Sequence, residues 1–481
     1  MNEAVEPITL EHPLGIANQA THGSLPRLAQ FLDVSIFYGL LVVIALTAIP
    51  YGTVEPWWVS LFECLIFVIA ILAVIESLIS ARRPLYLSLA APLLILILFM
   101  VFQSLPLFSG MGPISVRTAI SADPFGTRQV AVKLLALVVT GLLLLRYTSS
   151  RDRLRTLIYV VIGIGIATAC FGLIRRNSQT GPGFLLPGLP MNGRGFAQFI
   201  NRNHFAFLME MGLGLSLGLI VVEFRRYRRL LVLLLASVLM WVALIYSNSR
   251  GGIIASLCEM VFLAVLLDPV RRLTKDRAQD KWSRLRTVAG GLAVRIFLVA
   301  FLIGLFAYGV GWVGGEQVIS NFEVAGTAFD QPGVDVRVNT RRKQIWSSTW
   351  QLIKANPITG VGFGGYWIGI TKYHDASGDF TPQEAHNDYL ELLASGGLIG
   401  CALVAWFIVA LVRTARSRLR SPDPYRRAAC LGALAGIFGV AVHSFVDFGL
   451  HMTINSLVLC SLIVIAVNQV EAPVSRSQTV V

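Results

Sequence analysis

Long runs of apolar residues recur from one end of the chain to the other, separated by polar segments. Most runs approach or exceed the roughly 20 residues that an α-helix needs to cross a bilayer. A membrane β-barrel would instead show short segments in which apolar and polar positions alternate. The pattern predicts an all-α polytopic membrane protein with about twelve transmembrane helices. The predicted spans are 34–52, 57–79, 86–105, 129–146, 155–174, 197–222, 229–246, 251–268, 292–314, 396–414, 427–446 and 452–470.

The composition agrees with a membrane protein. Of the 481 residues 55% are hydrophobic and 14% are charged, whereas about a quarter of a soluble domain is charged. The six cysteines lie in or beside apolar runs and show no CxxC or Cys/His spacing, so we expect neither a disulfide framework nor a zinc site. The first 33 residues lack the pattern of a cleaved signal peptide.

Basic residues predict the orientation. The net charge is +13, and arginine is concentrated in short alternate loops, which favours a cytoplasmic position for those loops rather than nucleic-acid binding. Both termini are then cytoplasmic. The chain divides into an N-terminal tail (1–33), helices one to nine (34–314), an outer loop (315–395), helices ten to twelve (396–470) and a C-terminal tail (471–481).

The polar clusters that could carry chemistry all fall on the outer side in this topology. Five of the seven histidines lie there, and the outer loop 315–395 is too long for a plain connector, which indicates function. The clusters are NRNHF (201–205), SNSRGG (247–252), NTRRKQIW (339–346), EAHNDY (384–389) and HSFVDFGLH (443–451).

The outer loop contains two predicted helices. The first runs from Asn339 or Thr340 to about Ala355, with an arginine and two tryptophans at a spacing of four on one face. "GVGFGG" (360–365) predicts a flexible turn, and no βαβ unit surrounds it to support nucleotide binding.

The second predicted helix begins with a capping box. Thr381 is a suitable N-cap, Pro382 suits the first helical position and Glu384 completes the box. His386 would then lie in the second turn, near the positive end of the helix. That position favours the neutral imidazole that a general base requires.

Several of these motifs resemble the O-antigen ligase and O-antigen polymerase superfamily. The resemblance covers roughly residues 195–465, and the histidine motif is its most specific part; the first 190 residues match only as apolar spans. The motifs are NRNHFA (201–206), SRGG (249–252), HNDYLELLASGGLIG (386–400) and HSFVDFGLHM (443–452).

The resemblance implies a GT-C-like fold with a lateral opening for lipid, in a bacterial inner membrane, with the active site facing the periplasm. The implied activity transfers a glycan from undecaprenyl pyrophosphate to an acceptor hydroxyl without metal or other cofactor. We expect ligation of O-antigen to lipid A-core in lipopolysaccharide synthesis. Polymerisation onto a second lipid-linked glycan, or protein O-glycosylation, uses the same donor and chemistry and stays open. Membrane lipids are expected partners, and nucleic acid is not.

The resemblance assigns His386 as the base and Arg342 and Arg250 as the cations that bind pyrophosphate, with Arg341 as the alternative to its neighbour. The chemistry fits these residue types: pyrophosphate is already a good leaving group, so the step needs a base and positive charge. A single displacement would invert the anomeric centre. The outer face shows no DxD motif, which agrees with metal-independent transfer and argues against a glycosidase with paired carboxylates.

Five further residues are candidates for substrate binding, and each has a structural alternative. Asn203 and His204 would equally line a cavity. Trp346 would stack on a sugar or anchor the loop at the membrane interface. Asn387 would orient the loop. For His443 we favour a hydrogen-bond network with Asp447 and His451, because a spacing of four places all three on one helical face.

A polysaccharide transporter or flippase is the competing class, and a non-catalytic subunit is a third. A transporter typically contains internal repeats, with charges or helix breaks near the midplane. The halves of this chain show no convincing repeat, and its polar residues gather at one face. The sequence therefore favours a metal-independent, inverting glycosyltransferase.

Overall fold

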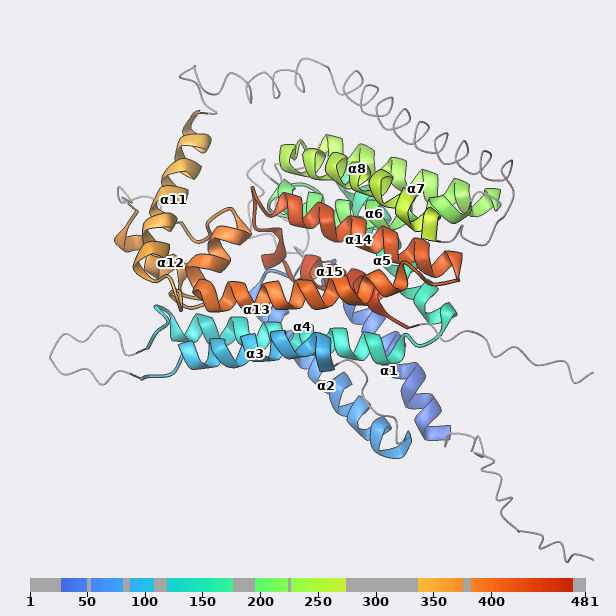
Figure 1. The fold of residues 1–481 in the computed structure, drawn as a ribbon, viewed down its shortest axis with the longest axis horizontal. Coiled ribbons are helices and arrows are strands. Elements are labelled where there is room, and N and C mark those ends of the chain that lie inside the picture. The colour runs from blue at the N-terminus through green and yellow to red at the C-terminus, as the bar shows by residue number, and fades with distance from the viewer. Residues whose placement is uncertain are drawn as a thin grey trace, which may run out of the picture.

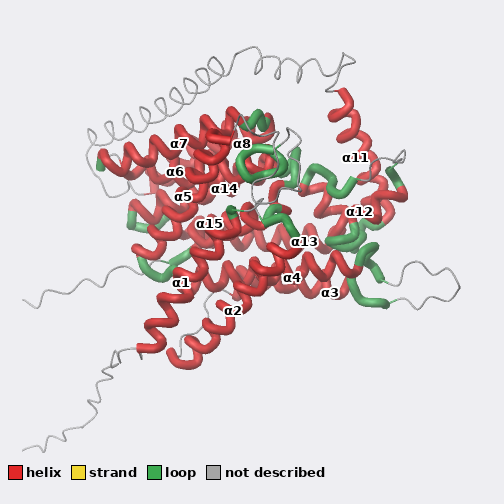
Figure 2. Tube along the Cα trace, turned by 180° about the vertical axis from the view of Figure 1, so that it is seen from behind, coloured by secondary structure: helices red, strands yellow, loops and turns green. Residues whose placement is uncertain are grey.

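The structure is a computed structural model that describes residues 27–49, 53–80, 87–107, 119–175, 195–223, 226–273, 336–374 and 382–469. Within these ranges the regular structure is helical apart from one isolated bridge (Figures 1 and 2). The helices are α1 (Arg27–Thr47), α2 (Pro56–Ser80), α3 (Leu87–Gln103), α4 (Pro124–Tyr147), α5 (Arg151–Arg175), α6 (Arg202–Glu223), α7 (Tyr227–Tyr246), α8 (Arg250–Leu273), α11 (Val336–Ala355), α12 (Tyr366–Gly369), η2 (Ile370–Lys372), α13 (Asp388–Arg418), α14 (Pro424–His443), η3 (Gly449–His451) and α15 (Thr453–Val467).

The prediction of an all-helical polytopic membrane protein is confirmed. In the described ranges nine helices are long and apolar enough to cross a membrane, and two shorter apolar helices, Ser88–Gln103 and Thr453–Val467, accompany them. Each predicted span coincides with a helix except 292–314, which lies outside the described residues. The tenth span differs most, because α13 begins at Asp388 rather than at 396 and so includes part of the histidine motif.

Helix α6 forms the centre of the bundle, and 89% of its most apolar stretch is buried. Its closest neighbour is α14, which it meets through glycines. A Cβ added to Gly218 would lie 2.3 Å from the Cα of Gly432, so the two backbones are in direct contact there. Small residues permit this close approach, and membrane helices associate largely by such packing.

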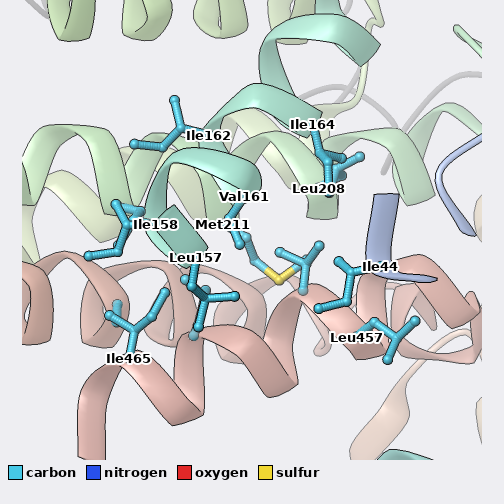
Figure 3. Close-up of a cluster of buried hydrophobic side chains, with 14 of the residues drawn as sticks. Ile44, Leu157, Ile158, Val161, Ile162, Ile164, Leu208, Met211, Leu457 and Ile465 are labelled. Carbon is cyan, nitrogen blue, oxygen red and sulfur yellow. The ribbon is translucent and has the colours of Figure 1, made fainter. Parts of the chain in front are cut away.

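Apolar side chains from several helices fill the space beside α6. In Figure 3 Ile44 of α1, Val161 of α5 and Leu457 of α15 lie together around Met211 of α6. Other large apolar side chains point outward, such as Leu78 of α2, which is 81% exposed. An outward apolar surface suits a helix that faces lipid, where leucine is as well solvated as in the protein core.

Ion pairs and carbonyl contacts join the helix ends that carry the arginine-rich loops. Arg146, at the end of α4, donates to Glu76 of α2 at 2.6 Å. Arg153 at the start of α5 pairs with Asp33 of α1. Arg426 of α14 donates to carbonyl groups at the end of α15, including that of Ala466 at 3.0 Å. The arginines at this end are thus partly used in holding neighbouring helices together.

At the opposite end α13 is broken by a glycine, and a loop completes its hydrogen bonds. Gly397 has φ 60° and ψ −161°, a conformation that is essentially restricted to glycine. The carbonyl groups of Ala394 and Ser395 accept hydrogen bonds from Val361 and Gly362, and Leu398 N–H donates to the carbonyl of Pro357. Non-helical backbone at such a depth is tolerated only where protein satisfies it.

The chain turns at 360–365 as predicted, and hydrogen bonds hold this turn in place. Its first residues form a specific hydrogen-bonded contact with the break in α13, and Val361 also accepts from Ala122 N–H at 2.8 Å. The sequence shows the glycines but not the distant carbonyl groups that order them. The loop connects α11 to the start of α4 and to α13, so it fixes the outer segments against the bundle (Figure 1).

We predict that Gly397→Ala destabilises the protein by about 1–3 kcal/mol, because a side chain is strained at this φ and ψ and its Cβ would lie 2.3 Å from the carbonyl oxygen of Ile358. The measurement is the melting temperature in detergent. Gly163→Ala is the matched control, since no atom lies within 4 Å of the added Cβ. Equal melting temperatures for the two variants would contradict this account of the break.

Candidate functional site

Three polar side chains from separate segments converge on the carboxylate of Asp447, which lies between α14 and α15 and is fully buried. Asn203 of α6 donates its side-chain amide to Asp447 Oδ2. His386 Nδ1 lies 3.5 Å from Asp447 Oδ1, and Arg342 Nη2 of α11 lies 4.0 Å from Oδ2. The sequence positions of these groups span more than half of the chain, and the helix ends bring them to one place.

The surroundings of Asp447 favour its charged form. Burial by itself would raise the pKa of this carboxyl, but the His386 contact, the nearby His204 and the hydrogen bond from Asn203 outweigh burial and lower the pKa below its usual value. Asp447 is therefore a carboxylate in the native protein. Removing its charge would leave the histidine and the arginine without their shared partner.

Phe448 separates three histidines that surround its ring. The centroids of His204 and His386 each lie 4.8 Å from the centroid of Phe448, and that of His451 lies 5.5 Å away, all in edge-to-face arrangements. The ring therefore fixes the spacing of the imidazoles around Asp447. His204 is buried, whereas the side chain of His386 remains 29% exposed, so His386 is the more accessible of these two to a substrate.

His386 does not lie inside a helix, so the predicted capping box is wrong. Thr381 lies outside the described residues, and Pro382 to Asn387 are non-helical. Helix α13 begins at Asp388, and the Asn387 side chain caps it by accepting from the N–H groups of Tyr389 and Leu390. His386 precedes this cap with φ 51°, in the left-handed region. Tertiary hydrogen bonds to its neighbour Ala385 replace the expected helical turn.

Arg250 lies next to the same network, at the start of α8. The preceding residue, Ser249, donates its hydroxyl to Asn203 Oδ1 at 2.9 Å, and Asn203 in turn donates to Asp447. The arginine is half-buried. The first turn of α8, which contains Arg250, is thus attached to the Asp447 network.

The remaining candidates lie in different surroundings. Arg341 has no described side chain. Asn387 is buried, and besides capping α13 it donates to the carbonyl of Phe445 at 2.9 Å. Trp346 donates its indole N–H to the carbonyl of Ala385 at 2.9 Å. The polar groups of Asn387 and Trp346 are thus engaged within the protein, and contact with substrate stays a prediction for both.

His443 is not part of the predicted network with Asp447 and His451. Helix α14 ends at His443, so the three residues do not share a helical face. The imidazole is fully buried, its Nδ1 lies 2.7 Å from Oε1 of Glu210 in α6, and its ring stacks on Phe207. The spacing of four was misleading because the chain turns after residue 443.

A second polar group lies deeper in the bundle than the sequence analysis allowed. Glu210 follows the start of α6 by about two turns, and Glu259 lies at a similar depth in α8; both are buried. An added Cβ on Gly439 of α14 would lie 3.1 Å from Glu259 Oε2, so the carboxyl faces the α14 backbone. The expectation that polar residues gather at one face is thus incomplete. Both glutamates interrupt apolar runs of the sequence, and such an interruption indicates a buried functional or paired group.

Asp447 is the main residue that sequence reasoning undervalued. The last motif contains this aspartate, but its spacing indicates only a partner for two histidines four residues away on either side. Its position at the meeting point of α6, α11 and the histidine motif depends on long-range packing. An aspartate flanked by apolar residues between two membrane spans was the available signal.

Comparison with known families gives a match over a part of the chain that contains some of the candidate site residues. Residues 235–405 match the family model described as O-antigen ligase. This match supports the resemblance to the O-antigen ligase and polymerase superfamily. The matched segment includes Arg250, Arg342 and His386, whereas Asn203 and Asp447 lie outside it. No curated protein matches the chain. The matched domain supports glycan transfer of the ligase or polymerase type in a multi-pass membrane protein.

We predict that Asp447→Asn lowers the free energy of unfolding by about 1–3 kcal/mol at pH 7, because charge-assisted contacts are lost. The lowered native pKa means that the carboxylate contributes fully above the unfolded-state pKa, near 3.8, and that this contribution is lost as the pH falls further. Melting curves from pH 3 to 8 should therefore show a difference between wild type and variant that is constant above about pH 5 and narrows as the pH falls below about 4.

The matched control for this series is Asp152→Asn, since the side chain of Asp152 is 93% exposed. We expect no measurable change for it at any pH, because exposed ion pairs contribute little. A constant difference between wild type and Asp447→Asn down to pH 3 would contradict a lowered pKa at Asp447.

Proposed function

We propose that this protein transfers a glycan from a polyprenyl pyrophosphate, such as undecaprenyl pyrophosphate, to an acceptor hydroxyl at the Asp447 network. The observation that carries the proposal is the meeting of His386 and Arg342 at one buried carboxylate, with Arg250 beside it. A base and two permanent cations at one end of a membrane bundle suit a reaction in which a hydroxyl loses a proton and a pyrophosphate departs.

In the proposed step His386 acts as the general base through Nε2. Nδ1 faces the Asp447 carboxylate, which favours a proton on Nδ1 and leaves the lone pair on Nε2 for the acceptor hydroxyl. The hydroxyl oxygen attacks the anomeric carbon while its proton moves to Nε2. Asp447 then stabilises the imidazolium that forms, as the aspartate does in a catalytic triad. In this arrangement the contact with Asp447, and not the end of a predicted helix, makes His386 suitable as a base.

The bond that breaks joins the anomeric carbon to the pyrophosphate oxygen, and the electron pair stays on that oxygen. Arg342 and Arg250 supply positive charge for the departing group, since guanidinium groups bind phosphate oxygens in pairs. Arg342 is 31% exposed, so part of its guanidinium is open to a ligand. One displacement inverts the anomeric centre. Metal ions are not required in this scheme, because pyrophosphate leaves readily and the arginines neutralise its charge.

An apolar groove supports a lipid-linked donor. It has a volume of about 230 Å³ and is lined chiefly by α3, α4, α13 and α15; apart from Gly141, only Ser456 and Cys460 among its lining residues are not hydrocarbon in character. Leu450 lies in its wall and directly precedes His451, so the groove reaches the segment that holds Phe448 and Asp447. A groove of this kind fits an isoprenoid chain whose pyrophosphate is held at the site.

The site lies at the end of the bundle opposite the arginine-rich loops, and such loops favour the cytoplasmic side. We therefore place the site at the periplasmic face of a bacterial inner membrane. There we propose lipid A-core as the acceptor, which makes the reaction an O-antigen ligation. Polymerase activity is the alternative, and the acceptor used by the purified protein separates the two.

We predict that His386→Ala lowers glycan transfer by a factor of about 10³ or more, because the reaction loses its base. The measurement is transfer in vitro from a polyprenyl pyrophosphate glycan to lipid A-core, and in parallel to a second lipid-linked glycan, with EDTA present. His374→Ala is the control and should retain activity. Retained transfer by a folded His386→Ala protein would reject the base, and dependence on added metal would reject the metal-free scheme.

We also predict that Leu142→Trp raises KM for the lipid-linked donor about tenfold, equivalent to about 1.4 kcal/mol, because Leu142 lines the groove and the larger ring would occupy it. The value of kcat should change little. Leu78→Trp is the control, since Leu78 is exposed on α2 and does not line the groove. An unchanged KM in Leu142→Trp would show that the lipid chain binds elsewhere.

A further inference from the structure

Ala385, the residue before His386, is held through both of its backbone polar groups. Ala385 is fully buried, its carbonyl accepts the indole N–H of Trp346 at 2.9 Å, and its own N–H donates to Glu391 Oε2 at 2.9 Å. Trp346 belongs to α11 and Glu391 to the first turn of α13. The two bonds therefore connect two helices through one residue, which directly precedes the histidine of the site.

His386 needs such support because its backbone is strained. A φ of 51° lies in the left-handed region, which costs a residue with a side chain about 1–2 kcal/mol. Strain of this kind persists only where surrounding contacts determine the conformation. The carbonyl of Ala385 belongs to the peptide plane from which φ of His386 is measured. On the other side, Asn387 is fixed by its cap and by the carbonyl of Phe445.

The left-handed backbone sets the direction of the imidazole. From this position the ring meets the edge of Phe448 and directs Nδ1 toward Asp447 Oδ1. In the helical turn predicted from the sequence the side chain would leave the backbone in another direction. Contact with Asp447 thus depends on the backbone of Ala385, whose carbonyl and N–H are held by Trp346 and Glu391.

Glu391 is itself held in place. Its second oxygen, Oε1, lies 3.4 Å from His451 Nε2, and the side chain is 12% exposed. The carbonyl of His451 accepts from Lys133 Nζ of α4 at 2.7 Å. Both carboxylate oxygens of Glu391 therefore face partners within the protein, which suits a supporting group rather than a second base.

We propose that Glu391 and Trp346 are positioning residues. Together they fix the N–H and the carbonyl of Ala385, so that His386 adopts the left-handed conformation that places its imidazole against Asp447. The proposal rests on the function proposed above, because it assigns the two residues to the base of that reaction. Neither residue touches the reacting atoms in this scheme. Trp346 thereby acts through its indole N–H and not as a platform for sugar.

The test compares variants that remove one of the two hydrogen bonds with a variant that retains it. Trp346→Phe keeps an aromatic ring and loses the N–H, Glu391→Ala removes the acceptor, and Glu391→Gln keeps a carbonyl oxygen that can accept from Ala385 N–H. We expect Trp346→Phe and Glu391→Ala to lower kcat for glycan transfer about 10- to 100-fold, because a misplaced base loses rate. KM for the donor should stay within about twofold, and Glu391→Gln should recover most of kcat.

Trp350→Phe is the matched control, because Trp350 lies one turn further along α11 and is half exposed. Its kcat should equal that of wild type. Each variant is checked for folding by its melting temperature and by size-exclusion chromatography. If Glu391→Ala fails to fold, Trp346→Phe still tests the bond to the Ala385 carbonyl, and Glu391→Gln still tests the bond from the Ala385 N–H.

Three results would overturn the proposal: wild-type kcat in Trp346→Phe and Glu391→Ala, a rise in KM without a fall in kcat, or a Glu391→Gln protein as slow as Glu391→Ala. These results differ from a failure of the proposed function. If His386→Ala retains transfer, the base is wrong, whatever the other variants do. If His386→Ala is inactive while folded Trp346→Phe and Glu391→Ala are fully active, the base stands and the positioning role is rejected.

Discussion

A buried carboxylate must be surrounded by donors, and in this protein that requirement brings the site together. Asp447 lies at the end of the bundle opposite the arginine-rich loops, and an amide, an imidazole and a guanidinium from three segments approach its two oxygens. An isolated charge at such a place would cost several kcal/mol. The partners offset that cost, and in doing so they place a base beside a cation. The network that satisfies Asp447 is therefore also the network that the proposed chemistry needs.

The backbone that supplies these partners departs from regular helix at two places, and each departure is compensated by hydrogen bonds. Helix α13 breaks at Gly397, where the loop around Val361 takes up the carbonyl groups that the break leaves. The chain just before α13 adopts a left-handed conformation at His386, and Trp346 and Glu391 hold the backbone of the preceding residue, Ala385. Both irregular segments lie against α11 or the loop that follows it. The outer segment thus contributes Arg342 and also stabilises the backbone that directs His386.

The sequence was sufficient for the helical architecture, but not for the geometry of the candidate site. Apolar runs predicted the helices because twenty residues of hydrocarbon-like side chain have few alternatives in a bilayer. Alternating arginine loops predicted which helix ends share a side, and the polar motifs do meet at one end. Local rules failed where distant groups decide the conformation: Thr381 and Glu384 form a plausible capping box, yet Ala385 bonds to Trp346 and Glu391 instead. The spacing of His443, Asp447 and His451 failed for the same reason, because α14 ends at His443 and its imidazole pairs with Glu210.

The proposed glycan transfer depends most directly on the negative charge of Asp447. The decisive measurement is the single-turnover rate of glycan transfer by Asp447→Asn, compared with wild type at saturating lipid-linked donor. Asparagine keeps the size of the side chain but cannot stabilise the imidazolium of His386, so we expect the rate to fall by a factor of about 10² or more while the donor still binds. A folded Asp447→Asn protein that transfers glycan at the wild-type rate would contradict the account.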